Sequence, residues 1–211
     1  MAWELNLKRL GLQQREGERV RTYGAYQVVI DGTAVPALSG HICECTGPGD
    51  NTARGKRKHL RIHEGRYALS TQFGEHFRSV DFTDEPRYPM PGFRLLGTEV
   101  RTDVLVHPGY PPTLYLSSIG CLNPTKPLTA DGDMDFEDSR ARVIALIDSL
   151  REHDPAAFAA NKIGDNTPIA NAFIVITGEP MTPVGEEAVA GARSPRRKVA
   201  AGARTRRRKP A

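Results

Sequence analysis

Cysteine is scarce in this sequence: three occur among 211 residues, together with a single tryptophan. Three cysteines are too few for a disulfide framework, and the odd number leaves at least one free thiol. Long apolar runs are also missing, because a run such as residues 173–176 is far shorter than the roughly 18 residues of a membrane span. The N-terminus lacks the apolar stretch of a secretory leader. We therefore expect a soluble protein that is cytoplasmic or exported by a non-classical route.

Acidic residues are absent from residues 191–211, where nine lysines and arginines occur. The whole chain has a net charge of +4, but the other 190 residues carry 20 basic and 25 acidic side chains. A mildly acidic body is unlike a nucleic-acid-binding fold, which carries its positive charge on the folded surface. We expect one domain over residues 1–180 and a disordered basic tail over residues 181–211, which has few large apolar side chains. Such a tail suits an anionic partner, either nucleic acid or a membrane surface.

The pattern of apolar residues predicts a mainly β fold with one main α-helix. Glycine (20) and proline (16) are frequent, which favours turns over a helical bundle. Alternation at residues 3–7 and the apolar run at 26–30, before Asp31-Gly32, predict strands joined by a turn. Further strands are expected at residues 42–46, 66–71, 102–107 and 173–177. Apolar residues spaced as on a helix, after a capping pair at Asp135 and Asp138, predict a helix over residues 137–153.

The strongest chemical pattern is a histidine followed by a cysteine. His107 lies at the end of a predicted strand, and Cys121 follows within the sequence Ser118-Ile119-Gly120-Cys121-Leu122-Asn123. A thiol needs a base within hydrogen-bond reach to become a nucleophile. Gly120 permits a tight backbone that exposes the sulfur and turns amides toward a developing oxyanion. A small buried thiol without any catalytic role is the alternative.

This pattern resembles the active-site motif of the L,D-transpeptidases (YkuD-like), in which a histidine precedes Ser/Thr-His-Gly-Cys and an asparagine. The resemblance implies a β-sandwich or barrel. It also implies that Cys121 is the nucleophile, His107 the base, and Gly120 with Cys121 the oxyanion donors, within a catalytic set that includes Ser118. Asn123 and Tyr115 are then expected to contact substrate. The substrate class implied is the peptidoglycan stem peptide, attacked through a thioester, with no cofactor.

Two positions depart from that family's pattern. Ile119 stands where the family has its second histidine, and no arginine follows Cys121. A second resemblance, over residues 3–180, is to a family of phage and bacterial proteins of unknown function that is related to the same fold. Its elements occur here in the same order, at residues 5–9, 23–24, 30–32, 43–46, 50–51, 62–67, 91–92, 107 and 120–121.

Two other clusters are weaker. His41, Cys43 and Cys45 alternate along a predicted strand, but structural zinc needs four ligands, so we expect half-buried neighbours and no metal. A basic loop at residues 54–61 is expected to be solvated, because it has no aromatic residues to stack on bases. Cysteine-dependent acyl transfer or hydrolysis on cell-wall peptide is thus the leading hypothesis. The alternatives are a non-enzymatic phage or secretion-associated scaffold or binding protein, and a nucleic-acid-associated protein acting through its tail.

Overall fold

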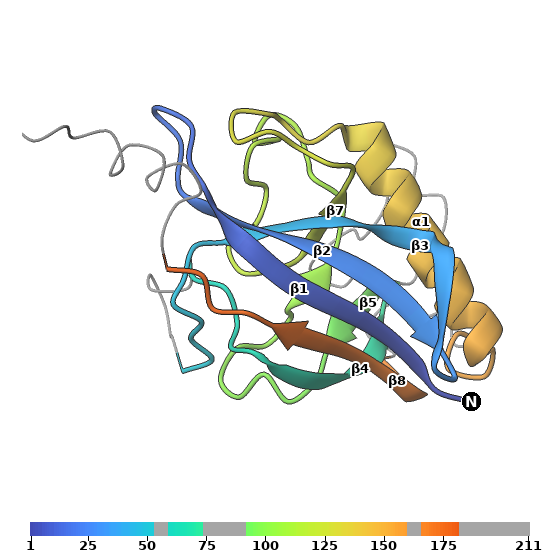
Figure 1. The fold of residues 1–211 in the computed structure, drawn as a ribbon. Coiled ribbons are helices and arrows are strands. Elements are labelled where there is room, and N and C mark those ends of the chain that lie inside the picture. The colour runs from blue at the N-terminus through green and yellow to red at the C-terminus, as the bar shows by residue number, and fades with distance from the viewer. Residues whose placement is uncertain (53–58, 74–91, 160–165, 182–211) are drawn as a thin grey trace, which may run out of the picture.

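The computed structural model describes residues 1–52, 59–73, 92–159 and 166–181, and its main feature is one eight-stranded sheet (Figure 1). The strands and the helix are β1 (Trp3–Gln13), β2 (Arg21–Ile30), β3 (Thr33–Cys45), β4 (Gly65–Gln72), β5 (Gly92–Leu95), β6 (Leu105–Val106), β7 (Asn123–Thr125), α1 (Phe136–His153) and β8 (Pro168–Thr177). The strand order in the sheet is β6-β5-β4-β8-β1-β2-β3-β7. The mainly β fold with one helix is therefore confirmed. The predicted tail lies outside the described residues, apart from Met181.

The first three strands form an antiparallel meander, as the alternation predicts. Trp3, Leu5 and Leu7 of β1 are fully buried, because period-2 alternation directs them to one side of the sheet. The turn between β2 and β3 consists of Asp31 and Gly32, both with positive φ (46° and 80°). Two consecutive positive φ values match the right-handed twist of the flanking strands, which explains a glycine in this turn.

The last strand enters the middle of the sheet. β8 pairs in parallel with β1 and antiparallel with β4, so the sheet is mixed. The strand begins at Pro168, five residues before the predicted start, and its Ile174 and Ile176 are buried. Burial between two neighbouring strands explains the apolar run that marked this strand in the sequence.

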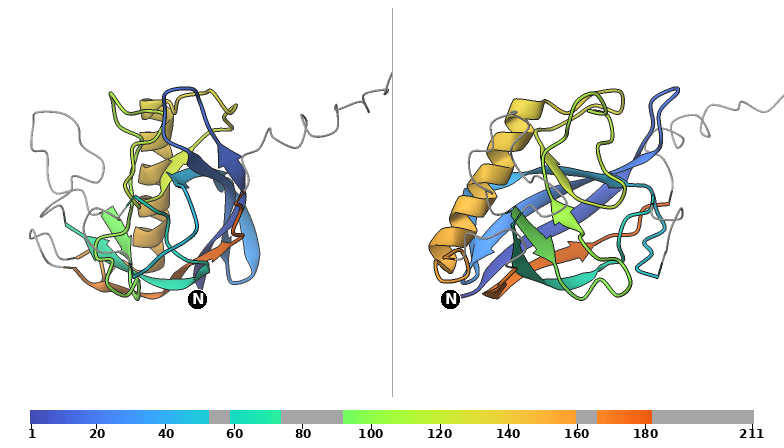
Figure 2. Two further views of the ribbon diagram at one scale, coloured as in Figure 1. Left: turned by 90° about the vertical axis from the view of Figure 1, so that its left-hand side faces the viewer. Right: turned by 180° about the vertical axis from the view of Figure 1, so that it is seen from behind.

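The two edge strands of the sheet meet and nearly close it into a barrel (Figure 2). Val106 of β6 forms a parallel bridge with Leu122, which lies just before β7. Leu122 N–H donates to Leu105 O at 2.9 Å, and His107 N–H donates to Leu122 O at 3.1 Å. The strand expected at residues 102–107 is shortened to two residues, because Asp103 has a φ of 60° that extended backbone does not allow. The closure places His107 beside the segment that contains Cys121.

Helix α1 covers the core with the face that its apolar spacing predicts. Asp135 is the N-cap, and its side chain accepts from Asp138 N–H at 3.1 Å, which confirms the predicted capping pair. Val143 and Ile147 are fully buried in the same cluster as Trp3, whose indole N–H donates to Ser149 Oγ at 3.0 Å. Within the described part of the chain, no helix is long and apolar enough to cross a bilayer.

Candidate active site

The closure of the sheet positions the predicted base. His107 follows β6 and is partly buried. Its ring Nδ1 lies 2.7 Å from Pro108 O, so that bond holds the proton on Nδ1, while Nε2 lies 3.4 Å from the side-chain nitrogen of Asn123. The ring stacks on Tyr110 with centroids 5.5 Å apart. Burial lowers the pKa of His107 to about 4, so the imidazole is neutral at pH 7 and able to accept a proton.

The predicted nucleophile lies on the neighbouring segment. Cys121 is partly buried, and its sulfur is 3.4 Å from Leu105 N–H and 3.7 Å from Asp103 O. Burial raises the pKa of Cys121 to about 11, outweighing the Leu105 amide and the positive charge of Arg101, which both lower it. In the described part of the chain no hydrogen bond joins this sulfur to the His107 ring. The resting pair is therefore a neutral thiol and a neutral imidazole.

Asn123 connects the two segments. Two residues after Cys121, it lies on the same side of its strand, because side chains alternate in direction. Asn123 is fully buried, and its amide N–H donates to His107 O at 2.9 Å and to Pro108 O at 3.3 Å. This placement brings Cys121 and His107 to one side of the closing strand pair. It also makes Asn123 a residue that holds the histidine in place.

Ser118 organises the turn before the cysteine. Its buried hydroxyl donates to Cys121 O at 2.7 Å and accepts from Gly120 N–H at 2.8 Å. The Gly120 amide, expected to point toward an oxyanion, is thus bonded to Ser118 in this conformation. Tyr115 is separate from His107 and Cys121: it is buried under the guanidinium groups of Arg21 and Arg15, at 4.0 and 4.5 Å from its ring centroid.

Sequence reasoning missed Arg101, which the structure places against the cysteine turn. The turn from Thr98 to Arg101 is closed by Arg101 N–H donating to Thr98 O at 3.1 Å, and Thr98 Oγ1 donates to Arg101 O. A methyl group built on Gly120 would lie 1.7 Å from Arg101 Nη2, so only glycine admits the guanidinium here. The sequence signals this contact only through Gly120, because a glycine indicates that some group lies close to its backbone but does not identify that group. Asp103, which lies four residues before His107, pairs with Arg94 at 3.1 Å.

Backbone carbonyls of a neighbouring loop hold Arg101. Arg101 Nη1 donates to Leu60 O at 2.7 Å and to Asp50 O at 3.2 Å. The segments that contain Asp50 and Leu60 are themselves hydrogen-bonded to each other, because Asp50 N–H donates to Arg61 O at 3.0 Å. Arg61 was expected in a solvated basic loop, but it is fully buried, and residues 53–58 lie outside the described residues.

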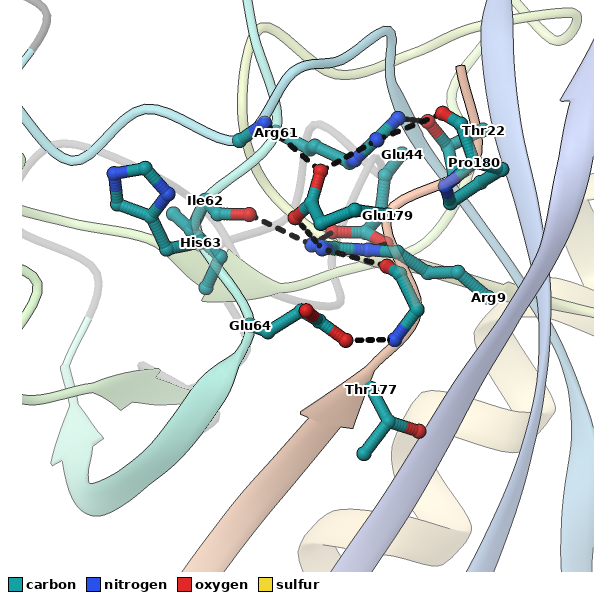
Figure 3. Close-up of polar contacts among 12 residues, drawn as sticks. Arg9, Thr22, Glu44, Arg61, Ile62, His63, Glu64, Thr177, Glu179 and Pro180 are labelled. Atoms are coloured by element: carbon teal, nitrogen blue, oxygen red, sulfur yellow. Dashed lines mark hydrogen bonds and ion pairs between the residues drawn. The ribbon is translucent and has the colours of Figure 1, made fainter. Parts of the chain in front are cut away.

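A buried ionic cluster fixes Arg61, and we call it the Arg9 cluster: Arg9, Glu44, Arg61 and Glu179 (Figure 3). Arg9 binds Glu44 with two nitrogens, at 2.8 and 2.9 Å. Glu179 lies between the two arginines, 2.8 Å from Arg9 Nη1 and 2.7 Å from Arg61 Nη2. Its carboxylate also accepts from Gly49 N–H at 3.1 Å. The cluster thereby ties the segment after β8 to the loop that holds Arg101.

The other cysteines offer neither a disulfide with each other nor a metal site. Cys43 and Cys45 are fully buried rather than half-buried, and burial raises the pKa of each to about 11. His41 stacks on Tyr23 with centroids 4.8 Å apart. Within the described ranges no group of three or more histidine, cysteine or acidic side chains is arranged to hold a metal ion.

The structure thus places a thiol, an imidazole and a guanidinium on neighbouring segments, with no hydrogen bond between the described side chains of Cys121 and His107. No family model matches the chain, and neither a curated protein nor a solved structure matches it significantly. Any assignment of function therefore depends on the geometry of these residues.

Proposed function

We propose that the protein carries out cysteine-dependent acyl transfer or hydrolysis, with Cys121 as nucleophile and His107 as base. The observation that carries this proposal is the closure of the sheet. It brings the partly buried residues Cys121 and His107, the latter with an unprotonated Nε2, to the same side of one strand pair. The proposed substrate, a peptidoglycan stem peptide, comes from the resemblance of the His107 and Gly120-Cys121 pattern to L,D-transpeptidases.

The chemistry starts from two neutral groups. As Cys121 Sγ bonds to the substrate carbonyl carbon, its proton passes to Nε2 of His107. The carbon–nitrogen bond then breaks, and the imidazolium returns the proton to the leaving amine, which gives a thioester. An acceptor amine or water attacks the thioester, loses its proton to His107, and releases the Cys121 thiol. Since Nδ1 is bonded to Pro108 O, the ring keeps one orientation through both steps.

A scaffold or binding protein of the same fold is the second candidate. One observation favours it: burial raises the pKa of the Cys121 thiol to about 11, whereas an activated thiol has a lowered pKa. The two candidates differ in what the folded protein does to an acyl donor.

The test compares matched cysteine variants on a stem tetrapeptide. We expect wild-type protein to release D-alanine and to form a thioester visible by mass spectrometry. Cys121→Ala should abolish both, whereas Cys43→Ala, which removes a fully buried thiol elsewhere, should retain both. His107→Ala should slow the reaction by about 100-fold or more, the usual contribution of a general base. If Cys121 is the least reactive of the three thiols toward electrophiles, the scaffold candidate replaces this proposal.

A further inference from the structure

One of the two fully buried cysteines lies across the sheet from Cys121. β3 and β7 are antiparallel, and the last pair of their ladder is Cys43 opposite Asn123. In an antiparallel ladder a step forward on one strand is a step back on the other. Two residues beyond that pair, the same register therefore sets Cys45 opposite Cys121. β3 remains a strand as far as Cys45, because its pairing with β2 continues to that residue.

The turn before β7 contacts both of these cysteines. The Cys45 thiol donates to Ser118 O at 3.1 Å, and the Ser118 hydroxyl donates to Cys121 O at 2.7 Å. Burial is the main cause of the raised pKa of Cys45, and the nearby Cys121 adds to it. The hydrogen bonds thus agree with the register in placing Cys45 and Cys121 at one turn.

This placement suits a covalent bond between the two sulfurs. Opposite residues of an antiparallel pair have Cα atoms about 4.5–5.5 Å apart, and a disulfide joins Cα atoms about 4.4–6.8 Å apart. Since side chains alternate in direction along a strand, Cys45 and Cys121 share the side of the sheet that Cys43 and Asn123 occupy. To reach Cys45, the Cys121 sulfur has only to leave its contact of 3.4 Å with Leu105 N–H.

We propose that Cys45 and Cys121 form a reversible disulfide, with a low-molecular-weight disulfide as the oxidant. The partly buried Cys121 reacts first: its thiolate bonds to one sulfur of the small disulfide, whose S–S bond breaks and releases a small thiolate. The Cys45 thiolate then bonds to Cys121 Sγ and releases the second small thiolate. The two protons lost by the cysteines pass through solvent to the two small thiolates. Two protein thiols are thus oxidised, and one small disulfide is reduced to two thiols.

The burial of Cys45 fits the second step and not the first. A fully buried thiol with a raised pKa is inert toward reagents in solvent, whereas an intramolecular step needs no access from outside. The disulfide blocks Cys121 until a small thiol reduces it. This inference goes beyond the proposed function, because the exchange needs no acyl donor.

The test treats the folded wild-type protein with oxidised glutathione in mildly alkaline solution. We expect the intact protein to lose two hydrogen atoms in mass and to carry no glutathione. Alkylation should then find one free thiol, Cys43, and a non-reducing peptide map should show the peptides of Cys45 and Cys121 joined. Dithiothreitol should restore all three thiols.

Single-cysteine variants identify the partner. Cys45→Ala should stop at the first step and accumulate about tenfold or more of the adduct between Cys121 and glutathione than wild-type protein does, because no neighbouring thiol displaces it. Cys43→Ala is the matched control: it removes an equally buried thiol from the same side of β3 and should form the disulfide as wild-type protein does. If Cys45→Ala fails to fold, the peptide map of wild-type protein still decides.

Three results would overturn the proposal. The first is a wild-type protein that keeps glutathione on Cys121, and the second is an internal disulfide that persists in Cys45→Ala. The third is a folded protein that does not react, while the urea-unfolded chain does. Failure of the proposed function looks different, because D-alanine release can be absent from a protein whose Cys45 and Cys121 still form the disulfide.

Discussion

At the scale of the residue, burial decides the charge state of the two proposed catalytic groups. The spacing of His107 and Cys121 suggests an activated thiol with a lowered pKa, but burial raises the pKa of Cys121 to about 11 and lowers that of His107 to about 4. Both shifts favour the neutral form, because a low-dielectric surrounding disfavours charge. Proton transfer must therefore accompany attack on the substrate. Spacing identifies the pair, but it carries no information about burial.

The pKa of His107 has a consequence for stability that can be measured. The folded pKa of about 4 lies below the ordinary 6.5, so the unfolded chain binds more protons between these values. Stability should fall as the pH is lowered through this window, by up to about 3 kcal/mol from this group. Urea unfolding at pH 7, 6, 5 and 4 should show less of this decline in His107→Gln. Equal declines in both proteins would mean that the imidazole is not buried in its neutral form.

Gly120 is required both by its backbone and by its neighbour. Its φ is 148°, and a Cβ would overlap Arg101 Nη2. Gly120→Ala should therefore displace the guanidinium and destabilise the fold by about 2–3 kcal/mol. Gly17→Ala is the matched control, because Gly17 also has positive φ (79°) but has no atom within 4 Å of its added methyl. We expect about 1 kcal/mol for the control, and urea unfolding of the two variants measures the difference. Equal losses of stability in the two variants would argue against contact between Gly120 and Arg101.

At the scale of the element, the sequence predicts structure wherever local signals agree. Helix α1 was predicted within one residue, because a capping pair and a helical apolar spacing mark the same segment. The strand at residues 102–107 was predicted too long, since the positive φ of Asp103 has no sequence signal of its own. The pairing of β8 between β1 and β4 also escapes prediction, because partners distant in sequence are chosen by the whole core.

The loop that holds Arg101 shows the limit most clearly. A run of basic residues ordinarily indicates a solvated surface, yet Arg61 is buried in the Arg9 cluster. Its partner Glu179 is 118 residues away. Arg101 itself closes a short turn with no sequence motif, and its side chain is held by hydrogen bonds to Leu60 O and Asp50 O, which are distant in sequence. The candidate pair could thus be found from the sequence, whereas the cation beside it could not.

At the scale of the whole molecule, the Arg9 cluster joins the end of the barrel to the proposed site. Glu179 follows the central strand β8 and binds Arg61 and Gly49, whose loop carries the carbonyls that hold Arg101 (Figure 3). The described chain continues to Met181, which is 60% exposed. Among the described residues, Glu179 and Pro180 make the last hydrogen bonds at this end of the chain, and the Pro180 carbonyl accepts from Arg61 at 2.9 Å.

This boundary predicts a contrast between two variants. A chain ended after Met181 keeps every contact of Glu179 and Pro180, so its free energy of unfolding should stay within about 0.5 kcal/mol of the full chain. Glu179→Gln keeps the length but leaves Arg61 without its carboxylate, and should cost about 2 kcal/mol at pH 7.

Burial acts to raise the pKa of Glu179, but the hydrogen bonds from Arg61 and Gly49 outweigh it and hold the pKa below 4.5. The stability that Glu179 supplies is therefore present above pH 4.5 and lost as the pH falls through its folded pKa. In urea unfolding, the free energies of unfolding of the wild-type chain and of Glu179→Gln should converge below pH 4.5. If the chain ended after Met181 is as unstable as Glu179→Gln, residues beyond Met181 contribute to stability and the boundary is wrong.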